Sequence, residues 1–203
     1  AELRAHDMGL ILDIVPNHMA VGGSDNAWWQ DLLAWGRASP YAEFFDIQWH
    51  SSDPLLKGQL LLPFLGNDYG ASLQEGSIRL RFNADTGAFH AEYGTHHFPI
   101  CPLHYATLLG NSPQQSLQVL AEQFSALKDS DSPREQALAL QQQLAVFSQS
   151  PGADDAIQQL LSHFDSRHAQ GFARLHQLLE RRATDWPAGA PPPNNSKGGG
   201  SLM

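Results

Sequence analysis

A short run near the start of the chain constrains the fold more than any other feature. Residues 10–15, Leu-Ile-Leu-Asp-Ile-Val, are apolar except for Asp13, which is typical of a strand buried on both faces of a parallel α/β sheet. Pro16 cannot donate to a strand ladder, so Asn17 and His18 should follow at the carboxyl end of the strand. Because a parallel strand needs neighbours, we expect this chain to start in the middle of a domain.

A short helix is predicted over residues 26–35, where Trp28 and Trp35 fall on one helical face together with a leucine. Since they share that face, these two tryptophans are expected to pack in the core and not to stack on a sugar. Ser24 or Asp25 precedes the helix and would cap its amino end.

The segment that follows is predicted to be rich in strands. Apolar residues alternate over 78–82 and 89–93, and the turn sequence 83–87 lies between them, which predicts a β-hairpin. Prolines in the next stretch, 96–102, favour an irregular extended path. Two further strands are expected at 44–49 and 59–62.

From residue 103 onward the pattern is helical. Ser132-Pro133-Arg134-Glu135 predicts a capping box with proline at the first helical position. Asp154-Asp155 begins another helix, where acidic side chains favour the helix dipole, so we interpret the pair as a cap and not as a catalytic dyad. The expected fold is α+β with a helical C-terminal half, built from packed antiparallel helices. Its apolar stripes are Leu117, Leu120, Phe124 and Leu127; Leu140, Leu144 and Phe147; Ile157, Leu160, Leu161 and Phe164; and Phe172, Leu175, Leu178 and Leu179.

Composition argues against several classes of function. The formal net charge is −9 and no long basic run is present, so nucleic acid and anionic membranes are not expected partners. No apolar run reaches the length of a membrane span and no signal-peptide pattern is present, so a cytoplasmic location is expected. Cys101 is the one cysteine, which excludes an internal disulfide.

Four histidines, His90, His96, His97 and His104, could suggest a metal site. Their spacing fits no closed zinc pattern, and no cysteine thiolate pairs with them. Hydrogen-bonding or sugar-contacting roles are therefore favoured, and neither a metal site nor a cofactor is predicted.

The run from Asp13 to His18, Asp-Ile-Val-Pro-Asn-His, matches the first sequence signature of the α-amylase superfamily, which lies at the end of the third barrel strand. The surrounding text narrows the match. Asn26-Ala27-Trp28-Trp29, Leu61-Leu62-Pro63-Phe64-Leu65-Gly66 and His97-Phe98-Pro99-Ile100-Cys101-Pro102 are similar to the maltooligosyltrehalose synthases in particular. The helical stretch 115–181 looks like the large insertion of that family after the third strand.

This resemblance implies an enzyme that converts the reducing-end α-1,4 linkage of a maltooligosaccharide into an α,α-1,1 linkage. It implies that His18 hydrogen-bonds a sugar hydroxyl, that Asn17 orients its loop and that Asp13 is a buried structural carboxylate. The nucleophile and the acid/base of the family lie on later strands, and no Arg-x-Asp motif occurs here. No catalytic residue is therefore predicted in this chain, and no turnover by the chain alone.

Four regions are predicted: 1–22 as the third barrel strand and active-site loop, 23–110 as an inserted mixed α/β subdomain, 111–182 as a helical insertion, and 183–203 as a disordered tail. We interpret the tail as a frame-shifted reading of the parent gene. Read from the third base of each codon, Asp185/Trp186 can encode only Leu and Trp186/Pro187 only Ala, as in the family. A linker, and for the whole chain a stand-alone carbohydrate-binding or purely structural module, are the alternatives.

Overall fold

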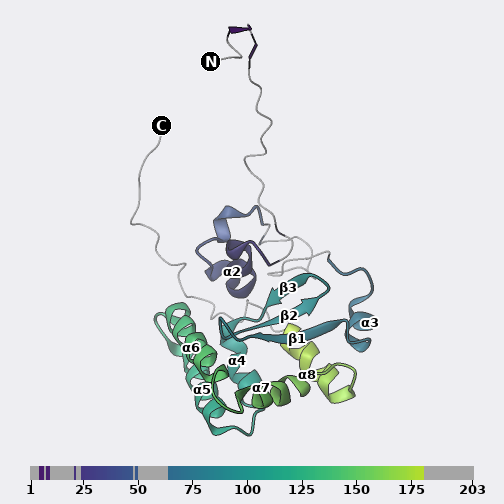
Figure 1. Cartoon of the computed structure of the whole chain (residues 1–203), viewed down its shortest axis with the longest axis vertical. Helices are drawn as coiled ribbons and strands as arrows, with labels where there is room; N and C mark the ends of the chain where they lie inside the picture. The colour runs from purple at the N-terminus through teal and green to yellow at the C-terminus, as the bar shows by residue number, and fades with distance from the viewer. Residues whose placement is uncertain are drawn as a thin grey trace.

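The computed structural model describes residues 24–47 and 64–180, together with residues 5, 6, 8, 9, 21 and 49. The described part is α+β, with a small antiparallel sheet and helices on both sides of it (Figure 1). Three of the predicted features, the barrel strand at 10–15, the strand at 59–62 and the tail from 183, lie outside the described residues.

The sheet consists of β1 (Ile78–Asn83), β2 (Ala88–Tyr93) and β3 (His96–Pro99), in the order β1-β2-β3 with both pairs antiparallel. The predicted hairpin is confirmed as β1 and β2. Asn83 fixes the turn. Its side-chain oxygen accepts hydrogen bonds from the backbone amides of Asp85 and Thr86, at 3.0 and 3.2 Å.

The expectation of an irregular path after the hairpin was wrong over 96–99. These residues form β3, in which Phe98 lies opposite Ala91 and His97 lies opposite Glu92. Pro99 is tolerated because it is the last residue of a strand at the edge of the sheet.

The two faces of the sheet have different environments. Ile78, Leu80, Phe89 and Ala91 are buried on one face, and this face belongs to the core that α4, α5 and α6 also line. Side chains on the other face alternate with them and are polar. In Figure 1 the helices α4 to α7 lie on one side of the sheet and α2 lies on the other, beside β3.

The helices match the predicted stripes. In the four stripes every member is buried except four, which are partly buried and pack against the core: Phe147, Leu161, Phe172 and Leu179. Buried residues from Ala34 to Leu178, drawn from the sheet and the helices, pack together in one hydrophobic core. The α-helices are α2 (Ala27–Trp35), α3 (Tyr69–Gln74), α4 (Tyr105–Leu109), α5 (Gln115–Ala126), α6 (Pro133–Ser148), α7 (Ala153–Ser162) and α8 (Ala169–Glu180). None of them is long and apolar enough to cross a membrane.

Helix α2 forms as predicted, but its cap and its buried face differ. Asn26 caps it, because its side-chain oxygen accepts hydrogen bonds from the amides of Trp28 and Trp29 at 3.1 Å, so the expectation of Ser24 or Asp25 was wrong. Trp35 is in the core as expected, whereas Trp28 is 41% exposed and Trp29 is buried instead. The reason is that the buried face follows i, i+3 spacing from position 29.

The predicted strand at 44–49 was also wrong for the described residues 44–47 and 49. Residues Ala42–Phe44 form a 3-10 turn, in which the amide of Phe44 donates to the carbonyl of Tyr41 at 3.0 Å. Phe44 points away from the core and is 62% exposed. Apolar residues in a row therefore mark an exposed aromatic surface here and not a buried strand.

Two of the predicted helix starts can be compared with the structure. Pro133 is the first residue of α6, as expected, but the side chain of Ser132 makes no capping hydrogen bond, so the capping box does not form. Asp154 and Asp155 do lie in the first turn of α7, as expected, but the cap position is held by Gly152 and no side chain makes a capping hydrogen bond, so the interpretation of the pair as a cap was wrong.

Candidate functional site

The three residues predicted to contact substrate, Asp13, Asn17 and His18, lie outside the described residues. Their roles therefore remain predictions. Helix α2 is the first described element after these residues in the sequence. The surface around α2 is therefore considered first.

That surface carries a cluster of aromatic rings. The rings of Trp28 and Tyr41 are parallel, with centroids 5.1 Å apart and an interplanar angle of 7°, and Phe44 lies at 5.1 Å from Trp28. Trp28 and Phe44 are the exposed members. Exposed aromatic faces of this kind can stack on the apolar faces of sugar rings, and sequence reasoning missed the cluster because it placed Trp28 in the core.

A carboxylate on the same helix holds this surface against the helical half. Asp31 accepts a hydrogen bond from the hydroxyl of Ser39 at 2.6 Å, and its other oxygen forms an ion pair with Arg134 of α6. Its side chain is 18% exposed. With both oxygens engaged, Asp31 has a structural role.

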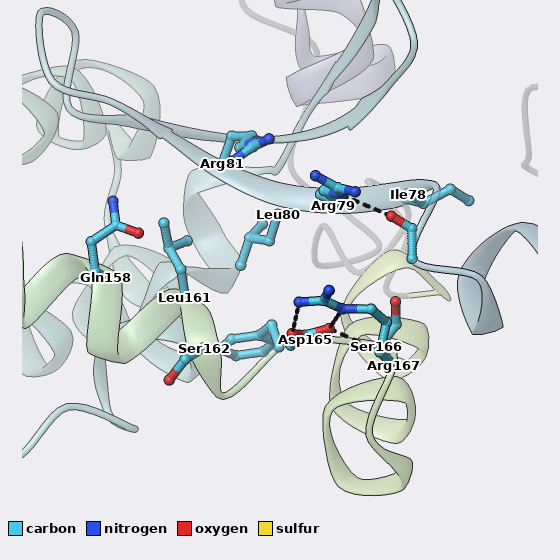
Figure 2. A pocket seen from close by; sticks show the side chains of 12 residues that line it. Ile78, Arg79, Leu80, Arg81, Gln158, Leu161, Ser162, Asp165, Ser166 and Arg167 are labelled. Carbon is cyan, nitrogen blue, oxygen red and sulfur yellow. Dashed lines mark hydrogen bonds and ion pairs between the residues drawn. The ribbon is translucent and has the colours of Figure 1, made fainter.

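A small hollow lies beside β1, where the edge of the sheet meets the segment between α7 and α8 (Figure 2). Its volume is about 230 Å³. Arg79, Arg81 and Arg167 line it together with Asp165 and Gln158. In Figure 2 the guanidinium of Arg167 faces Asp165, to which it donates two side-chain hydrogen bonds of 2.9 and 2.6 Å.

The charges of this hollow are largely satisfied internally. The hydrogen bonds from Arg167 lower the pKa of the Asp165 carboxyl from 3.8 to about 2, and Asp165 in turn raises the pKa of Arg167. Arg79 donates to the carbonyl of Gly76 at 2.8 Å, and Arg81 donates to Glu92 at 3.2 Å. A polar molecule could rest here, but the geometry offers no acid–base pair.

A tyrosine, a histidine and a glutamate lie in series between α3 and α8. The hydroxyl of Tyr69 lies 3.3 Å from Nδ1 of His176, and Nε2 of His176 lies 3.5 Å from Glu180. The order resembles a nucleophile, a base and an acid. Burial, and next the charge of Glu180, raise the pKa of Tyr69 to about 12, so its phenol stays protonated and the series serves to join two helices.

The histidines singled out from the sequence separate into different environments. His90 and His97 lie together on the polar face of the sheet, with ring centroids 4.5 Å apart, and Glu92 lies with them. His96 points to the opposite face and stacks on Phe64 at 4.5 Å, and His104 is buried. Linear spacing could not reveal the first group, because it forms only through the register of β2 with β3.

Comparisons with known proteins found relatives for part of the chain. Two curated proteins of Mycobacterium tuberculosis, from strains CDC 1551 / Oshkosh and ATCC 25618 / H37Rv, are each 54% identical to it over 69 residues. Both carry the name "Putative maltooligosyl trehalose synthase". The matched stretch covers 34% of this chain and 8% of the relative, so the chain corresponds to a small part of the proteins it matches.

No family model matches the chain, and no solved structure does. Asp31, Glu92 and Asp165, the carboxylates of the sites described above, each form an ion pair with an arginine. The resemblance to the maltooligosyltrehalose synthases is therefore supported by the sequence match alone, and it is confirmed over a stretch of 69 residues.

Proposed function

We propose that this chain is part of the catalytic domain of a maltooligosyltrehalose synthase. The whole enzyme would isomerise the reducing-end α-1,4 linkage of a maltooligosaccharide to an α,α-1,1 linkage by intramolecular transglucosylation. The observation that carries the proposal is the 54% identity over 69 residues to proteins of that name. In this proposal residues 1–22 supply the third barrel strand and its loop, residues 23–182 are inserted after it, and the enzyme acts in the cytoplasm.

The chemistry of such a reaction divides between this chain and the rest of the enzyme. A retaining transfer needs one carboxylate to attack the anomeric carbon and another to protonate the departing oxygen. The sequence offers no motif for either, so these groups would come from other strands. This chain would contribute His18, which would donate a hydrogen bond to a hydroxyl of the reacting sugar, with Asn17 and Asp13 supporting that loop.

The released glucose must turn within the site and attack through its own anomeric hydroxyl, so water has to be excluded. The aromatic cluster of Trp28, Tyr41 and Phe44 supports this part of the proposal, because it presents apolar rings shortly after the predicted loop in the chain.

A chimera tests the proposal directly. Residues 1–181 replace the corresponding segment of a Mycobacterium tuberculosis relative, and the product from maltopentaose is followed by loss of reducing ends. We expect the chimera to form a non-reducing product and the chain alone to form none. A folded chimera without activity, beside an active parent, would contradict the assignment, and so would robust product formation by the chain alone.

The same chimera tests His18. Losing one hydrogen bond that strengthens in the transition state costs about 2–4 kcal/mol, so His18→Ala should lower kcat/KM about 30- to 1000-fold. The matched control is His6→Ala, a histidine before the predicted strand, which should leave kcat/KM unchanged. Equal kcat/KM for the chimera and its His18→Ala variant would rule out the role.

A second candidate is a carbohydrate-binding module without catalysis, and the exposed rings of Trp28 and Phe44 favour it. It predicts that the chain alone binds maltopentaose and that Trp28→Ala abolishes binding. Trp29→Phe, at a buried position of the same helix, is the control. Binding by the chain together with an inactive chimera would favour this candidate over the synthase.

A further inference from the structure

Three side chains with atoms that can bind a metal ion lie together on the polar face of the sheet. His90 and Glu92 are two residues apart on β2, so they point to the same side, and His97 of β3 lies directly opposite Glu92. One potential ligand atom from each of the three lies within 4.8 Å of the other two. All three side chains are half-buried, so their positions are restricted by neighbours.

We propose that His90, Glu92 and His97 form a binding site for a divalent transition metal ion of the zinc class. Two imidazoles and one carboxylate are a donor set that Zn²⁺ accepts, with a fourth position left for water. Donor atoms around tetrahedral zinc lie about 3.4 Å apart, so rotations about the side-chain bonds have to bring these groups closer by no more than about 1.4 Å.

The surroundings of His90 favour its neutral imidazole, and a neutral imidazole is the form that binds metal. Burial, and next the neighbouring His97, lower the pKa of His90. The rings of the two histidines approach to 4.5 Å between centroids, which two imidazolium ions would not favour. The carbonyl of His97 accepts a hydrogen bond from Gln30 of α2 at 3.2 Å, which holds β3 in place beside the site.

Arg81 is the group that competes with a metal ion. It lies opposite His90 on β1 and donates two hydrogen bonds to Glu92, both to Oε1, at 3.3 and 3.2 Å. Among the described residues Arg81 binds only that oxygen of Glu92, so Oε2 can serve the metal. The guanidinium is partly exposed and can move toward solvent, but its positive charge weakens the site.

This arrangement distinguishes the site from scattered surface histidines. Closing the three ligands on one ion would join β2 to β3, so binding should stabilise the fold. It would also place a fixed metal next to α2 on the side of the sheet away from the helical core. Sequence analysis predicted no metal here, since it examined only linear spacing.

The test uses the whole 203-residue chain without a histidine tag. Isothermal titration with Zn²⁺ should give one site that Mg²⁺ does not occupy, because Mg²⁺ prefers oxygen donors, and Zn²⁺ should raise Tm. His90→Ala and His97→Ala should each weaken binding at least about tenfold, since even outer-sphere losses cost 10–100-fold. Glu92→Gln, which keeps the shape, should weaken it too.

Two variants make the prediction specific. His96→Ala, one residue away but on the opposite face, should bind Zn²⁺ as the parent does. Arg81→Gln should bind more tightly, because it removes the competing charge. Co²⁺ in place of zinc should give a visible absorption band that disappears in His97→Ala. Zinc binding unaffected in folded His90→Ala and His97→Ala, or weakened equally in His96→Ala, would overturn the proposal.

Discussion

Arg134, at the start of α6, forms an ion pair with Asp31 of α2, although 103 positions separate them in the chain. The pair is only partly exposed, and Asp31 also accepts a hydrogen bond from the hydroxyl of Ser39. It is therefore a direct link between α2, the helix that follows the predicted active-site loop in the sequence, and the helical half.

Removing this link should destabilise the chain. Asp31→Ala leaves the guanidinium of Arg134 in a partly buried place without its partner, so we expect the free energy of unfolding to fall by about 1–3 kcal/mol. Asp31→Asn keeps an acceptor for Ser39 and should cost less. Urea unfolding measures both. As the control, Arg81→Gln breaks an ion pair that is more exposed than this one and should cost less than about 1 kcal/mol. Equal effects at the two places would contradict the interpretation.

Two glycines with the same backbone conformation differ in their surroundings. Gly87 has φ 65° and Gly94 has φ 58°, but a Cβ on Gly87 would lie 1.8 Å from the backbone carbonyl oxygen of Gln141, whereas a Cβ on Gly94 would have no atom within 4 Å. Gly94→Ala should cost about 1–2 kcal/mol from backbone strain alone. Gly87→Ala should cost a further 1–3 kcal/mol or so, because β2 and α6 must separate.

The measurement compares the free energies of unfolding of Gly87→Ala and Gly94→Ala. Unfolding in urea at one pH gives both free energies, and circular dichroism checks that each variant folds. If Gly87→Ala were no more damaging than Gly94→Ala, the close packing of the hairpin turn on α6 would be wrong.

Tyr105 connects the sheet to α6 through its hydroxyl. It is fully buried, and its oxygen accepts hydrogen bonds from the amide of Phe89 at 2.8 Å and from the side chain of Gln141 at 3.1 Å. Tyr105→Phe would leave both donors without this acceptor in the core, so the free energy of unfolding should fall by about 1–3 kcal/mol. Tyr93→Phe, whose hydroxyl bonds an exposed amide, is the control and should cost less than about 1 kcal/mol.

Asp165 should make the free energy of unfolding depend on pH in a defined direction. Its folded-state pKa of about 2 lies below the ordinary 3.8, so the fold favours its ionised form. Its contribution to stability is present above about pH 4 and is lost as the pH falls through 2. The stability difference between the parent and Asp165→Asn should therefore shrink from pH 6 to pH 2, and added salt should reduce it because the ion pair is exposed.

The partner of the ion pair supplies the check. Arg167→Gln should show the same loss of pH dependence as Asp165→Asn, since both remove the pairing that lowers the pKa. A difference between parent and Asp165→Asn that stays constant from pH 6 to pH 2 would mean that Arg167 does not stabilise the carboxylate.

Local pattern predicted those parts of the fold that local forces determine. The alternation around Asn83 specified the hairpin, and the apolar stripes of α5 to α8 specified their buried faces, because both depend on neighbours a few residues away. Strand β3 was missed because Pro99 suggested irregular chain, while its strand character comes from pairing with β2.

The site was less predictable, because distant pairings create it. The meeting of His90 with His97 follows from the register of two strands, and the engagement of Asp31 follows from a contact with α6, neither of which linear spacing reveals. Trp28 was misplaced because adjacent helical positions differ by only about 100° around the axis, and the pattern did not decide which of two adjacent tryptophans is buried. The predictions for Asp13, Asn17 and His18 await structural description of those residues.

The contact between Tyr69 and His176 has a consequence for the order in which the chain folds. It joins α3 to α8 across 107 positions, whereas β1 to β3 and α4 to α6 mostly meet their neighbours in sequence. Closing so long a loop costs more chain entropy than a hairpin does, so this contact should form after the sheet and the middle helices have assembled. By the same reasoning the backbone amides of α8 should exchange with solvent sooner than those of β2.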